Sequence, residues 1–100
     1  MKTIRDHIAA DPAVPAPPPG ATHVMVWEPY GPSRSQWALG ALDASTEDEA
    51  AALLDGPPDP DVAELAATVS SLLGYPVGLS ARIEVEDEIA YYVTPAGGGW

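Results

Sequence analysis

The strictest alternation of apolar and polar residues in this chain runs from residue 79 to residue 94. A period of two is typical of a strand with one buried face. Asp87 is the one polar residue on the apolar parity, which leaves two arrangements open. Either the segment is one long strand with a defect at Asp87, or it is a hairpin with a three-residue turn over 86–88. A two-residue turn would pair Val85 with Glu88 and mix the two faces, so the register of the faces excludes it.

Two more strands are predicted earlier in the chain, over residues 22–28 and 35–42. Both segments are rich in β-branched, aromatic or alternating apolar residues, and residues 29–33 between them have the composition of a turn. We therefore expect a hairpin in which Trp27 and Trp37 are cross-strand partners.

A first helix is predicted over residues 43–54. Thr46 and Glu49 have the spacing of a capping box, and acidic residues fill the first turn, where they meet the positive end of the helix dipole. Gly56 and the two prolines after it are expected to end this helix.

A second helix is predicted over residues 59–74, with Asp59 as its N-cap, Pro60 at the first helical position and Gly74 at its C-terminal end. The spacing of its apolar residues predicts one continuous buried stripe. That stripe consists of Val62, Leu65, Ala66, Val69, Leu72 and Leu73.

The N-terminal residues 1–10 predict a short helix, capped by Thr3 with Asp6 three residues later. Residues 11–20 contain five prolines and are interpreted as a stiff linker. A single domain then covers residues 21–95, and residues 96–100 form a flexible tail. The fold class expected is α+β: a two-layer structure in which two helices pack on an antiparallel sheet made of the N-terminal hairpin and the C-terminal strand or hairpin.

Composition narrows the function classes. The chain has no cysteine, which excludes disulfides and thiol chemistry, and together with the lack of a signal-peptide pattern this predicts a cytoplasmic protein. No nucleophile, zinc, phosphate-loop or dinucleotide motif is present, so we expect no enzyme and no cofactor. We also expect no metal, because the clustered acids match no known calcium-loop pattern. The low content of Lys and Arg argues against direct binding to nucleic acid or membrane.

Charge is distributed unevenly. Residues 1–42 carry three acids and three bases, whereas residues 43–100 carry twelve acids and a single base, Arg82, so the net charge of −11 lies in the second segment. Helix-start capping explains about half of these acids. The remaining ones centre on residues 84–88, where Glu84, Glu86 and Glu88 are predicted to form a row on one exposed strand face.

These features predict a non-enzymatic acidic binding protein that covers a basic, nucleic-acid-binding surface of a partner protein. In composition alone the chain resembles small viral anti-CRISPR and anti-restriction DNA mimics and nuclease immunity proteins. The alternative is a small structural or assembly subunit that docks through its N-terminal helix and Pro-rich arm. The predicted partner-binding residues are Glu84, Glu86, Asp87, Glu88, Tyr92, Glu47, Asp48 and Asp61.

Overall fold

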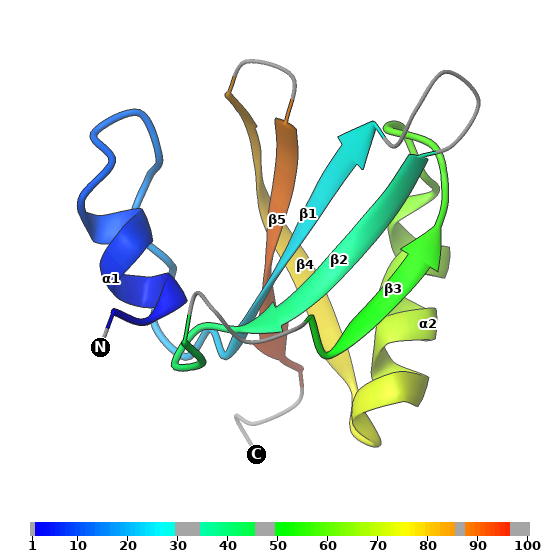
Figure 1. The fold of residues 1–100 in the computed structure, drawn as a ribbon. Coiled ribbons are helices and arrows are strands. Elements are labelled where there is room, and N and C mark those ends of the chain that lie inside the picture. The colour runs from blue at the N-terminus through cyan, green and yellow to red at the C-terminus, as the bar shows by residue number, and fades with distance from the viewer. Residues whose placement is uncertain (1, 30–34, 46–49, 86–87, 97–100) are drawn as a thin grey trace.

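The computed structural model describes residues 2–29, 35–45, 50–85 and 88–96. In that part of the chain, an antiparallel sheet of five strands in the order β3-β2-β1-β5-β4 is accompanied by two helices (Figure 1). The predicted α+β class is thus confirmed. The elements in chain order are α1 (Ile4–Ala9), β1 (His23–Pro29), β2 (Ser35–Ala41), β3 (Ala52–Asp55), α2 (Val62–Leu73), β4 (Val77–Val85) and β5 (Glu88–Pro95).

The hairpin of β1 and β2 forms as predicted. Its register pairs Trp27 directly with Trp37, and the predicted turn at 29–33 lies almost entirely outside the described residues. Trp37 is almost fully buried, and its ring lies 5.6 Å from that of Tyr91 on β5. Because large aromatic side chains bury much apolar area, the contact between Trp37 and Tyr91 stabilises the centre of the sheet.

The helix predicted over residues 43–54 is wrong, because residues 52–55 form strand β3. This strand pairs with β2 from Gln36↔Asp55 to Leu39↔Ala52. Ala52 and Leu54 face the core while Leu53 is exposed, which is the period of a strand. Pairing with the open edge of β2 provides partners for the backbone groups of residues 52–55 that point towards β2, so tertiary context overrides local helix propensity. The predicted capping pair, Thr46 and Glu49, lies outside the described residues.

Helix α2 is shorter than predicted. It begins after Asp61 rather than Asp59, so Pro60 precedes the N-cap, and it ends at Gly74 with a φ of 82°. Only Val69 is fully buried, with Leu65 and Leu73 packed beside it. These three residues are spaced by four and form the row that faces the sheet. The predicted stripe is therefore too wide, because Val62 and Leu72 are 38% and 50% exposed.

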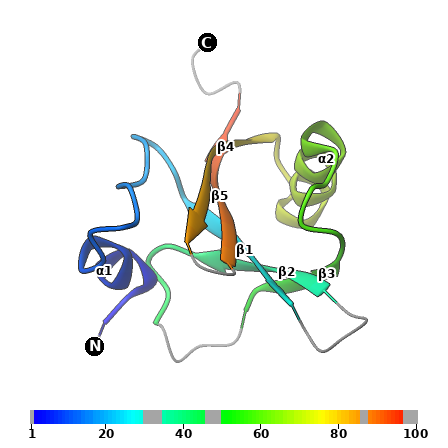
Figure 2. The same cartoon turned by 90° about the horizontal axis from the view of Figure 1, so that it is seen from above.

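Each face of the sheet has its own core. Helix α2 covers one face, where Met25, Leu39 and Val93 are buried. The other face is covered towards β5 and β4 by α1 and the Pro-rich segment, which bring Ile4, Ile8 and Val14 against buried Val24 and Tyr92 (Figure 2). The helices thus lie on opposite faces of the sheet, which gives three layers rather than two.

The N-terminal segment is packed against the domain. Helix α1 has the predicted capping box of Thr3 and Asp6. Its first amides donate to carbonyls that follow β2, from Ile4 N to Ala44 O at 2.9 Å and from Arg5 N to Leu42 O at 2.8 Å. The segment interpreted as a spacer is instead a structural part of the second core.

Candidate functional site

The hairpin of β4 and β5 decides where the predicted acidic row lies. Its register pairs Val85 with Glu88 and Glu84 with Ile89, so residues 86 and 87 connect the strands. The excluded two-residue connection is therefore the one that forms. A register shift between Ser80 and Ile83 inserts one extra residue into β4 and reverses the facing of the residues that follow it.

Because Val85 pairs with Glu88, Glu84 and Glu88 lie on opposite faces of the sheet. Glu84 is on the α2 face, where its carboxylate pairs with Arg82 at 3.0 Å. Glu88 is exposed on the other face, where it lines a groove together with His7. The predicted single row of Glu84, Glu86 and Glu88 is wrong on this point. Glu86 and Asp87, like Glu47 and Asp48, lie outside the described residues.

Tyr92 is not available to a partner. The side chain was predicted to bind the partner, but it is fully buried. Its hydroxyl donates a 2.6 Å hydrogen bond to the carbonyl of Pro15 in the Pro-rich segment. Burial raises the pKa of Tyr92 above its ordinary value. The sequence feature that could have predicted the burial of Tyr92 is the Pro-rich segment, because this segment covers the face on which Tyr92 lies.

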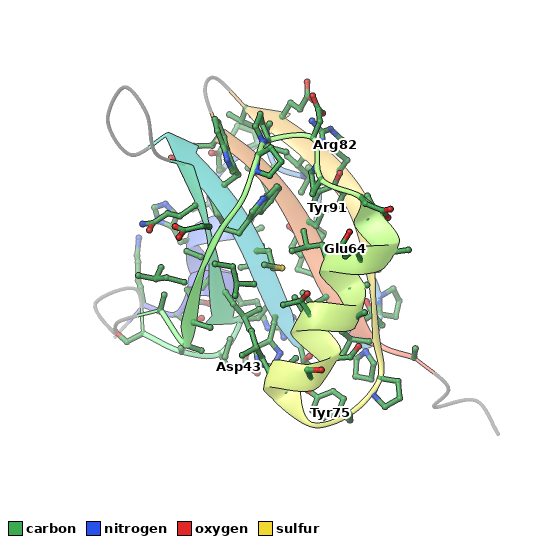
Figure 3. The ribbon with its side chains drawn as sticks, turned by 90° about the vertical axis from the view of Figure 1, so that its right-hand side faces the viewer. Asp43, Glu64, Tyr75, Arg82 and Tyr91 are labelled. Carbon is green, nitrogen blue, oxygen red and sulfur yellow. The ribbon has the colours of Figure 1, made fainter. Side chains whose placement is uncertain are left out.

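Acidic residues gather instead beside the start of α2. Arg82 on β4 donates to Asp59 at 2.9 Å, to the Pro58 carbonyl at 3.2 Å and to the Tyr91 hydroxyl at 2.7 Å. The bonds to Pro58 and Asp59 tie β4 to the loop before α2, while a further bond joins Arg82 to Glu84 on its own strand. Arg82 and Tyr91 lie close to each other in Figure 3. The hydrogen bond that Arg82 donates to the Tyr91 hydroxyl is the main reason why the pKa of Arg82 is raised. The guanidinium also lies 5.7 Å from the centre of the Tyr91 ring.

The tryptophan pair fixes the same loop from the other side. The Trp27 indole donates to the Gly56 carbonyl at 3.1 Å, and the Trp37 indole donates to the Pro57 carbonyl at 3.0 Å. Asp61 then caps α2 by accepting from the amides of Ala63 and Glu64. The loop from residue 56 to residue 61 is thus anchored at both ends, which holds its carboxylates in place.

We call Asp59, Asp61, Glu64 and Glu84 the α2 acidic patch. All four side chains are exposed, and Asp61 and Glu64 line a shallow cavity of about 330 Å³ beside Trp37 and Leu65. Of the predicted site residues, Glu84 and Asp61 belong to this patch. Sequence reasoning had treated Asp59 as a helix cap alone, and Arg82, the single base after residue 42, was the overlooked signal that Asp59 and Glu84 share a surface.

This arrangement can accept hydrogen bonds and attract positive charge. Carboxylates that are ionised at neutral pH are pure acceptors, and those held by Arg82 or by a helix cap have fewer rotamers to lose on binding. Among the described residues, no group of three or more His, Cys, Asp or Glu side chains is placed to hold a metal ion.

No family model, curated protein or solved structure was found to match this chain. In the part of the chain that the structure describes, neither helix is both long and apolar enough to cross a membrane.

Proposed function

We propose that this protein is a non-enzymatic acidic binding protein that covers a basic, nucleic-acid-binding surface of a partner protein. The observation that carries the proposal is the α2 acidic patch, which has four exposed carboxylates, of which Asp59 and Glu84 pair with Arg82. Proteins that hold nucleic acid do so with Lys and Arg directed at phosphates. An array of fixed carboxylates can occupy the same side chains and exclude the nucleic acid.

The net charge of −11 extends the effect beyond direct contact. Summed charge steers association over roughly one Debye length, about 8–10 Å at physiological salt. We therefore expect association to be fast at low salt and to slow as salt rises. A DNA-mimic inhibitor, whether of the anti-CRISPR, anti-restriction or nuclease-immunity kind, has this behaviour.

The assembly alternative has lost the feature that favoured it. It requires α1 and the Pro-rich arm to dock on a neighbouring molecule. In this structure Ile4, Ile8 and Val14 pack on the chain's own sheet, and Pro15 accepts from Tyr92. These contacts occupy the residues that the assembly alternative would need for a neighbouring molecule.

Two charge-matched variants test the proposal. The patch variant carries Asp59→Asn, Asp61→Asn and Glu64→Gln, and the control variant carries Asp6→Asn, Asp11→Asn and Asp43→Asn. Each removes three negative charges and keeps an acceptor oxygen at every position. Immobilised wild-type protein and both variants are incubated with nuclease-treated host lysate at low salt and eluted with a salt ramp.

We expect the wild type and the control variant to retain a nucleic-acid-binding protein that the patch variant releases at lower salt. The purified partner should then lose a labelled DNA duplex when wild-type protein is added. The proposal fails if retention is the same for both variants, or if the captured partner still binds its duplex when saturated with the protein.

A further inference from the structure

An apolar row crosses the sheet on the face opposite α2. The strand register aligns Ile83 with Ala90, Ala90 with Val26, Val26 with Ala38, and Ala38 with Leu53. Each of the five strands thus contributes one apolar residue to a single line. Sheet faces with such rows are normally covered by another layer of structure.

Described elements cover only half of this row. Towards β4 and β5, α1 and the Pro-rich segment pack over Ile83 and Ala90. Towards β3, Leu53 is 59% exposed, the largest exposure among the large hydrophobic residues described. An open groove of about 710 Å³ lies between the two halves, with Val26 and Ala38 on its floor and Ile4 and His7 at its wall.

The polar border of the groove is acidic. Glu88 lines the groove and lies two residues before Ala90, and Asp55 lies two residues after Leu53. Both are exposed, and alternation along their strands places them in the row next to the apolar one. The surface therefore combines an apolar line with negative charge along one side.

This charge selects among the possible occupants. A second copy of the chain or an anionic bilayer would meet a surface of like charge, since the net charge is −11. An extended strand would gain its hydrogen bonds at a sheet edge rather than on a face, whereas an amphipathic helix covers a face with one apolar stripe. Positive residues beside that stripe would complete the match.

We infer that this groove binds an amphipathic helix of a partner protein, with the helix's apolar stripe on Val26, Ala38 and Leu53 and its Lys or Arg residues beside Glu88 and Asp55. The site lies on the face opposite the α2 acidic patch and does not depend on it. From Glu88 on β5 to Asp55 on β3 there are three strand spacings, about 14 Å at 4.8 Å each. A helix of roughly 10 residues has that length at 1.5 Å per residue.

The probe is a fluorescein-labelled peptide of about 14 residues that carries leucines at helical spacing and lysines elsewhere. Binding is measured by anisotropy to the wild type, to Leu53→Asp and to the matched variant Leu72→Asp, whose leucine is 50% exposed on α2. Both variants add the same negative charge. We expect Leu53→Asp to weaken binding about tenfold despite its added charge, because an apolar contact is lost, and Leu72→Asp to bind as well as wild type or better.

Further measurements test whether the bound peptide is helical and whether Glu88 attracts its lysines. A peptide of the same composition with a central proline, which breaks the helix, should bind much more weakly. Glu88→Gln should weaken binding a few-fold and reduce its salt dependence. Circular dichroism confirms the fold of each variant, and Leu53→Ser replaces Leu53→Asp should the latter not fold.

Several results overturn the inference. Equal binding by Leu53→Asp and Leu72→Asp shows attraction by charge alone. Equal binding of the proline peptide shows that the occupant is not a helix. Sedimentation that finds a wild-type dimer abolished by Leu53→Asp assigns the face to a second copy, and binding to anionic vesicles rather than to the peptide assigns it to a membrane. None of these outcomes changes how the α2 acidic patch retains a partner from lysate. The helix-binding proposal and the proposed function can therefore fail independently of each other.

Discussion

Replacing Tyr92 by Phe tests whether the Pro-rich segment is a structural layer of the fold. Tyr92 is fully buried, and its hydroxyl joins β5 to the carbonyl of Pro15, 77 residues away in sequence. The ring remains in Tyr92→Phe, so the packing of the second core is kept. Only the hydrogen bond between sheet and segment is removed.

The expected loss follows from the geometry. A buried hydrogen bond contributes about 0.5–1.5 kcal/mol net. Pro15 is itself exposed, so water can reach its carbonyl in the variant and limit the cost of an unpaired acceptor. We expect the free energy of unfolding to fall by about 1 kcal/mol, which for a domain of this size lowers Tm by about 4–8 °C. Urea unfolding followed by tryptophan fluorescence measures the first value and calorimetry the second.

The same substitution has a pH signature. Burial raises the pKa of Tyr92, so the folded chain keeps its phenolic proton at pH values where the unfolded chain has released it. Stability that depends on this proton is complete below the ordinary pKa of about 10 and is lost as pH rises through the folded value. Wild-type stability should therefore decline more steeply above pH 10 than that of Tyr92→Phe.

Tyr75→Phe is the matched control, because Tyr75 is 38% exposed near the end of α2. It should leave the unfolding free energy within about 0.3 kcal/mol of wild type, as is usual for surface changes. A Tyr92→Phe variant as stable as Tyr75→Phe at neutral pH, with the same alkaline profile as wild type, would refute the packing described for the Pro-rich segment.

Three further predictions concern stability. Gly74→Ala should cost about 1 kcal/mol, because Gly74 has a φ of 82°, whereas Gly78→Ala, in open space at ordinary φ, should be close to neutral; thermal unfolding compares them. Val69→Ala should cost about 2 kcal/mol because its side chain is fully buried in the core, and Leu72→Ala less than about 1 kcal/mol because half of Leu72 is exposed; urea midpoints test this contrast. Burial lowers the pKa of His23, so the unfolded chain binds this proton more readily and stability should fall as pH drops below about 6.5; His23→Gln should remove that part of the pH dependence in urea titrations from pH 7.5 to 5.

Local sequence patterns correctly predicted those parts of the structure that depend on local geometry. The β1–β2 hairpin, the Trp27–Trp37 pair, the Thr3 capping box and the end of α2 at Gly74 are all confirmed. Turn composition, caps and cross-strand alternation are determined within a few residues, so a single sequence contains them.

The predictions were wrong where contacts with a distant segment of the chain determine the local structure. Residues 52–55 form a strand because the edge of β2 is available to them, although their own propensity favours helix. The pairing of Val85 with Glu88 puts Glu84 and Glu88 on opposite faces, and this pairing goes with a register shift earlier in β4 that no alternation pattern predicts. The burial of Tyr92 requires a proline-rich segment folded back over the sheet.

For the candidate site, the sequence by itself determined that the protein is strongly acidic and that the acids lie after residue 42. The tertiary structure decided which of them share a surface. Arg82 gathers Asp59 and Glu84 from segments 25 residues apart, because one guanidinium can donate to several acceptors at once. Charge is a property of composition, but a charged surface depends on which residues the fold brings together.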